Sequence, residues 1–194
     1  NDLGDLKGKR VGIAQAGSGT QVAVESMLAL WGVNRDNIDE AELNNSQSAE
    51  RLADGQIDAY FYAAGWPVAA MVQLSSTKGM ELHNFSDADL VKINEAVPAY
   101  IPSMIPGGVY EGIDYDAKTP AVSALLVVSS DLSDELVYGI TAALWNDNTR
   151  KLLDNGHAKG KQITAETALD GVAALGVPLH PGAEKFYKEA GLLK

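Results

Sequence analysis

The feature that most constrains this fold is the run Gly-Ile-Ala-Gln-Ala-Gly-Ser-Gly-Thr at residues 12–20. It follows a strand-like start and precedes a stretch whose apolar residues recur at helical spacing. A strand, a small-residue turn and a helix bring several unpaired backbone N–H groups to one point, where the helix dipole adds positive potential. Such a turn is suited to a carboxylate or phosphate of a small ligand, or serves simply as a helix cap. The candidate ligand contacts are Gly17, Ser18, Gly19 and Thr20.

A second small-residue loop follows the next strong strand-like run, residues 57–63. Its candidate ligand contacts are Ala64, Gly65, Trp66 and Pro67, and Pro67 is well placed to begin a helix. In an open parallel α/β sheet, ligands bind at the carboxyl ends of the strands, so we expect both loops to face one crevice. Trp66 is expected to stack on the ligand, to close the interface between the lobes, or to be a half-buried indole at the start of the helix.

The order of elements predicts an α/β fold. Strand-like and helical stretches alternate through the first half, which indicates a parallel sheet with helices on its faces. Expected strands include residues 9–14, 57–63 and 80–85, and residues 98–120 are expected to be an irregular, proline-rich crossover between two lobes. Residues 119–129 are apolar on both faces, which predicts a strand in the centre of a sheet. Only helices are expected after it.

Composition excludes several classes of partner and site. The formal net charge of −11 disfavours nucleic acid and anionic membrane surfaces. The chain has no cysteine, so disulfides, thiolate metal sites and a cysteine nucleophile are excluded. No apolar run approaches membrane-spanning length. We expect no cofactor.

Catalysis and metal binding are not expected. A Ser18-dependent hydrolase or transferase is the enzymatic alternative, but Ala16 occupies the position of the first glycine of a Gly-x-Ser-x-Gly elbow. His83, His157 and His180 are scattered without metal-ligand spacing, and local hydrogen bonding is expected for His180. We therefore expect no catalytic residue and no metal site.

Seven short motifs occur in an order that resembles the TAXI family of solute receptors of TRAP (tripartite ATP-independent periplasmic) transporters. They span nearly the whole chain, at residues 5–11, 17–20, 54–59, 64–67, 105–110, 124–127 and 178–184. The resemblance implies a two-lobed periplasmic binding protein of the type II class. Such a receptor traps a small carboxylate or an amino acid, often glutamate-like, between its lobes and delivers it to an ion-gradient-driven membrane permease.

The resemblance also implies a domain division. Residues 7–112 are expected to form the second, ligand-binding lobe, and residues 113–194 the C-terminal part of the first lobe, whose N-terminal segment is expected to be missing. The strand expected at residues 119–129 would then lack its sheet partners. A non-binding fragment that forms a homodimer through this unpaired strand is the third alternative.

Overall fold

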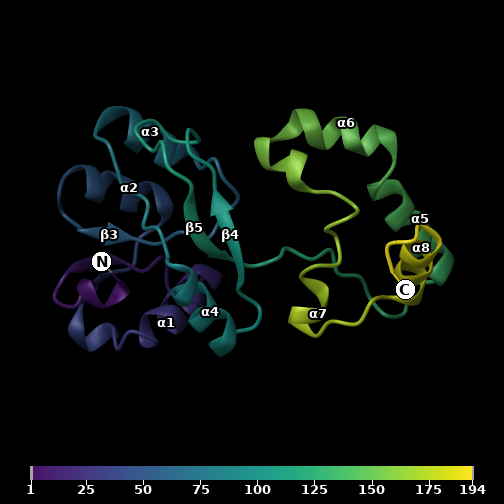
Figure 1. Cartoon of the computed structure of the whole chain (residues 1–194), viewed down its shortest axis with the longest axis horizontal. Helices are drawn as coiled ribbons and strands as arrows, with labels where there is room; N and C mark the ends of the chain where they lie inside the picture. The colour runs from purple at the N-terminus through teal and green to yellow at the C-terminus, as the bar shows by residue number, and fades with distance from the viewer. Residues whose placement is uncertain (1, 194) are drawn as a thin grey trace. The chain divides into compact units, whose positions relative to one another are not determined.

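The computed structural model describes residues 2–193, apart from the side chains of Ala173 and Ala174. The chain forms two compact units, which are described here one at a time (Figure 1). Unit 1 comprises the residues up to Ala96 together with Pro102–Ala121, and unit 2 comprises Val97–Ile101 and the residues from Val122 onward. The units separate after Ala121, whereas the predicted lobes meet at residues 112 and 113. The assignment of either part to a receptor lobe stays a prediction.

Unit 1 is built on a three-stranded parallel sheet, which confirms the predicted α/β class. Its strands are β1 (Arg10–Gly12), β2 (Asp39–Ala41) and β3 (Ala59–Tyr60), in the order β2-β1-β3. The strands are shorter than predicted. Gly12 permits their close approach, because a Cβ on Gly12 would lie 2.8 Å from the Cβ of Tyr60.

Four α-helices and two short 3-10 helices complete the alternation in unit 1. They are η1 (Leu3–Leu6), α1 (Gly19–Ala29), η2 (Arg35–Asn37), α2 (Asn45–Ala53), α3 (Ala69–Thr77) and α4 (Asp87–Ala96). The chain leaves β1 through α1 to reach β2 on one side, then returns through α2 to β3 on the other. Right-handed crossovers therefore place α1 and α2 on opposite faces of the sheet, as Figure 1 shows.

The region expected to be an irregular crossover contains a second, small antiparallel sheet. Strands β4 (Ile101–Ile105) and β5 (Ala117–Ala121) pair with each other, and the chain between them buries Tyr110 and Ile113. The strand predicted at residues 80–85 is absent; this segment is irregular. The Tyr115 hydroxyl bonds both the N–H and the carbonyl of Leu82, so a side chain satisfies the backbone groups that a strand would pair.

Unit 2 is helical in its described residues. Its elements are α5 (Asp134–Leu144), α6 (Asp147–Gly156), η3 (Ala158–Gln162), α7 (Val172–Leu175) and α8 (Pro181–Glu189). Helix α8 packs on α5, where a Cβ on Gly182 would lie 2.2 Å from the carbonyl oxygen of Asp134. The His180 ring caps α8 by accepting from the Gly182 N–H, which confirms the local role predicted for this histidine.

The long central strand predicted at residues 119–129 is wrong for most of its length. Strand β5 ends at Ala121, and the chain beyond it is irregular up to Ser129. The side chains of Val122, Leu126 and Val127 are 53%, 67% and 68% exposed. Apolar residues indicate a tendency to be buried, but a strand forms only where a neighbouring strand satisfies its backbone groups. The described part of unit 2 offers no such strand.

Candidate functional site

The turn between β1 and α1 is tightly shaped by its sequence. Gly17 has φ +73°, a left-handed conformation that glycine adopts readily, and Ala14 has φ +72°, which is costly for a residue with a side chain. Ser18 caps α1, because its Oγ accepts from the Gln21 N–H at 3.2 Å. A non-glycine residue held in this conformation beside an exposed turn is a feature that often accompanies binding sites.

Two backbone donors of this turn are unpaired. Among the described residues, the N–H groups of Gly19 and Thr20 have no hydrogen-bond partner, whereas the Gly17 N–H is bonded to the Gln21 side chain. The Ser18 and Thr20 hydroxyl oxygens each accept a backbone N–H, which leaves both hydroxyl hydrogens to donate. The turn therefore offers up to four hydrogen-bond donors to an anion.

The structure brings the two predicted loops together. Thr20 Oγ1 accepts from the N–H of Ala63 at 3.4 Å, which joins the start of α1 to the loop after β3. The strand order reverses between β1 and β3, and this is the switch point at which α/β sheets bind ligands. Ala64 and Gly65 are exposed, and Trp66 and Pro67 are half-buried across a cis peptide bond. Their contacts with a ligand stay predictions, as does the stacking role of Trp66.

One tyrosine supports the second loop, and another lies on the strand that precedes it. Tyr110 is 2% exposed and its hydroxyl accepts from the Val68 N–H at 3.0 Å, directly after the loop. The Tyr60 hydroxyl is buried without a hydrogen-bond partner among the described residues, and burial raises the pKa of Tyr60 to about 12. Tyr60 therefore stays protonated as a donor. Aromatic residues are common in strands, so the sequence around Tyr60 carries no signal for such a role.

The helices that follow the parallel strands have no acidic residue in their first turn. This is true of α1, α2 and α3. By contrast, α4, α5, α6 and α8 each carry Asp or Glu there. Acidic residues in the first turn of a helix compensate its positive potential, and α1 carries none of its own there, which favours an external anion.

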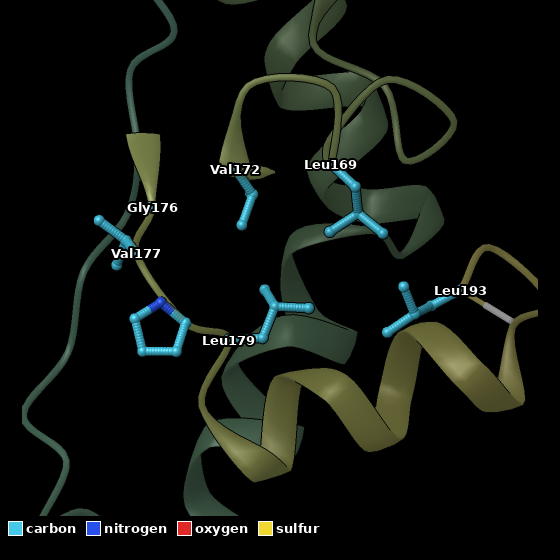
Figure 2. Close-up of a pocket in the computed structure, with 7 residues that line it drawn as sticks. Leu169, Val172, Gly176, Val177, Leu179 and Leu193 are labelled. Carbon is cyan, nitrogen blue, oxygen red and sulfur yellow. The ribbon is translucent and has the colours of Figure 1, made fainter. Parts of the chain in front are cut away.

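Two hollows are lined by residues outside these loops. In unit 2, Leu169, Val172, Leu179 and Leu193 line a shallow hollow of about 300 Å³, drawn in Figure 2. Its lining is almost wholly apolar, so it offers a carboxylate no hydrogen bonds. A second hollow, of about 400 Å³ beside α1 and η2, includes Arg35, but that guanidinium already bonds three carboxylates. The loops at the carboxyl ends of β1 and β3 therefore suit an anion better than either hollow does.

The geometry gives little support to Ser18 as a nucleophile. Its hydroxyl oxygen accepts from the Gln21 N–H, and among the described residues no histidine or carboxylate is hydrogen-bonded to it. His83 lies edge-on to Phe85 at 4.5 Å between ring centroids, and burial lowers its pKa. His157 and His180 lie in unit 2, where their rings accept the N–H groups of Lys159 and Gly182.

Comparison with known families agrees with a binding site. The model of the NMT1-like family matches residues 1–191, nearly the entire sequence. This is a family of the periplasmic binding-protein type, and its members bind solutes rather than catalyse reactions and are usually extracellular or periplasmic. No helix within residues 2–193 is both long and apolar enough to cross a membrane. The chain belongs to the NMT1-like family.

Proposed function

We propose that this chain captures a small carboxylate or amino acid, glutamate-like in character, at the edge formed by residues 17–20 and 64–67. The observation that carries the proposal is that the N–H groups of Gly19 and Thr20 have no partner in the described part of the chain. They begin a helix whose own first turn has no acidic residue, beside the switch point of the sheet. Backbone donors of this kind bind a carboxylate without needing a cationic side chain.

The finer assignment rests on the motif order. Seven motifs resembling TAXI receptors support a type II binding protein in the periplasm that hands its solute to a TRAP permease. In that arrangement residues 7–112 form the second lobe and residues 113–194 part of the first. A partner lobe would supply further contacts, including an arginine for a side-chain carboxylate.

A matched pair of serine variants tests the binding site. Ser18 and Ser133 are both N-caps whose hydroxyls accept a backbone N–H, from Gln21 at 3.2 Å and from Leu136 at 3.3 Å. We expect Ser18→Ala and Ser133→Ala each to lower the free energy of unfolding by about 1 kcal/mol. Only Ser18→Ala should weaken the binding of L-glutamate or succinate, measured by isothermal titration calorimetry.

Two results would contradict the proposed function or its site. A folded protein that shows no heat signal and no thermal shift with a panel of amino acids and dicarboxylates contradicts the proposed function, because any ligand of the folded state raises the unfolding midpoint. Equal loss of binding in the two serine variants would place the site elsewhere.

A homodimer is the second candidate, favoured by one observation. Val122, Leu126 and Val127 expose apolar side chains on an unpaired stretch of chain in unit 2. Pairing with the same stretch of another copy would satisfy its backbone groups. Size-exclusion mass of the wild type and of Val127→Lys tests this: a dimer that becomes monomeric in the variant supports it, and a wild-type monomer rejects it.

A further inference from the structure

Gln21 uses both ends of its side-chain amide within unit 1. It is 6% exposed, lies in the first turn of α1, and is one of the few buried polar side chains. Its Oε1 accepts from the Gly17 N–H at 2.8 Å, and its Nε2 donates to Glu42 Oε1 at 3.0 Å. One buried side chain therefore joins the turn after β1 to the residue that follows β2.

Chemistry fixes which way this amide points. The Gly17 N–H can only donate, so it must meet the amide oxygen, and the Glu42 carboxylate can only accept, so it must meet the amide nitrogen. Glu42 is in turn held by Arg35, whose Nη1 lies 3.2 Å from the same Oε1. Arg35 also bonds Glu25 and Glu40, and the hydrogen bond to Glu25 is the main reason that its pKa is raised.

We propose that Gln21, oriented by Glu42, is the positioning residue of the ligand-binding turn. Its Oε1 accepts the hydrogen bond of the Gly17 N–H and so holds the turn in one conformation. The anion then binds to the N–H groups of Gly19 and Thr20. This inference rests on the proposed function for its ligand. The hydrogen bonds that position the turn form without one.

Neighbouring backbone N–H groups of this turn therefore have different roles: the Gly17 N–H positions the turn, and the N–H groups of Gly19 and Thr20 are left for the ligand. If the Gly17 N–H bound the ligand, the Gln21 amide oxygen would have to leave it and remain buried without a donor, which is unfavourable. The turn is therefore ordered before the ligand arrives, which reduces the entropy lost on binding.

The sharpest variant is Gln21→Glu. A protonated carboxyl at this position reproduces the amide, because its carbonyl accepts from Gly17 while its hydroxyl donates to Glu42. An ionised carboxylate at position 21 would face the Glu42 carboxylate directly. The other charged groups of this cluster are Arg35 and the two further carboxylates that it bonds, Glu25 and Glu40. Like charges raise the pKa of such a carboxyl, so the variant should recover the wild-type turn on acidification to about pH 5.

The readouts are hydrogen exchange of the Gly17 and Gly19 amides by NMR and the dissociation constant for L-glutamate. In the wild type, Gly17 should exchange about tenfold or more slower than Gly19 after correction for intrinsic rates. In Gln21→Glu this protection and the affinity should both fall at pH 8 and return near pH 5. Gln73→Glu makes the same change at an exposed position of α3 and should alter neither.

The exchanged pair Gln21→Glu with Glu42→Gln completes the test. The carboxylate introduced at position 21 would accept from the Gly17 N–H and from the amide introduced at position 42. The oxygen of that amide would accept from Arg35, so protection should be regained at every pH.

Two outcomes overturn the inference: equal exchange of Gly17 and Gly19 in the wild type, or failure of the folded double variant to restore protection. If the single variant does not fold, the double variant decides. Normal Gly17 protection without L-glutamate or succinate binding would contradict the proposed function and leave the positioning intact.

Discussion

The helices that follow the parallel strands of unit 1 begin differently from three helices of unit 2. In unit 1, α1, α2 and α3 have no acidic side chain in their first turn, and two N–H groups of α1 have no partner among the described residues. In unit 2, α5, α6 and α8 each begin with an acidic residue in the first turn. These three helices of unit 2 therefore carry their own compensating charge, whereas α1 has no acidic residue of its own in its first turn.

The units also differ in how much apolar surface they bury. Among the residues whose burial is described, Val137 and Tyr187 are the only buried hydrophobic residues of unit 2, and all the others belong to unit 1. A buried core holds the loops of unit 1 in fixed positions. Unit 2 is held mainly by the contact of α5 with α8 and by polar links such as Trp145 Nε1 to the Tyr187 hydroxyl at 3.1 Å.

The largest expected effect compares one leucine from each unit. Leu28 is 2% exposed on α1 and Leu126 is 67% exposed. Leu28→Ala should lower the free energy of unfolding by about 2–5 kcal/mol, because it opens a cavity, whereas Leu126→Ala should stay within about 0.5 kcal/mol. Urea unfolding followed by circular dichroism measures both. A large loss for Leu126→Ala would show that something covers residues 122–128 in solution.

Two tyrosine hydroxyls give the next comparison. Tyr110→Phe leaves the Val68 N–H without its acceptor in unit 1, at a cost of about 1–3 kcal/mol. Tyr187→Phe removes the acceptor of the Trp145 indole N–H, a side-chain donor that can turn to water as a backbone N–H cannot, so about 1 kcal/mol or less is expected. The same unfolding experiment ranks them. A reversed order would mean that the hydrogen bonds of unit 2 matter more than its small core suggests.

A glycine pair tests the turn itself. Gly17 has φ +73°, whereas Gly19 begins α1, and neither would bring an added Cβ within 4 Å of another atom. Gly17→Ala should therefore cost about 1 kcal/mol through backbone conformation alone, and Gly19→Ala should be neutral or slightly stabilising. Thermal unfolding distinguishes them. Identical midpoints would contradict the left-handed turn.

The smallest expected effect is a pH dependence at the other end of β1. The Arg10 guanidinium bonds both oxygens of Asp58 and lowers the pKa of that carboxyl from 3.8 to about 2. The folded-state pKa is depressed, so the stabilisation is present above pH 3.8 and is lost as the pH falls towards 2. Asp58→Asn should flatten the fall in stability across that interval: the variant should be slightly less stable than the wild type at pH 7, and this difference should vanish near pH 2. An unchanged acid profile would show that the exposed pair contributes nothing measurable.

Short-range sequence patterns predicted the turns and helix caps, whose hydrogen bonds join residues only a few positions apart. The turn at residues 17–20 and the local hydrogen bonding of His180 follow from small residues and a capping side chain, and both are present. The parallel sheet followed from alternating patterns. The strand at residues 119–129 failed because its apolar pattern indicates burial and cannot say whether a partner strand is present.

By itself, the sequence determined the α/β class, the two strand-end loops and the absence of cysteine chemistry, since these depend on composition and on contacts a few residues apart. Only the tertiary structure decided that Thr20 meets Ala63, that Gln21 joins Gly17 to Glu42, and that Tyr110 supports Val68. These pairs are brought together by the strand order β2-β1-β3 and by packing of distant segments. A local sequence pattern predicts neither the strand order nor this packing, because the free energy that selects both comes from burying the whole core at once.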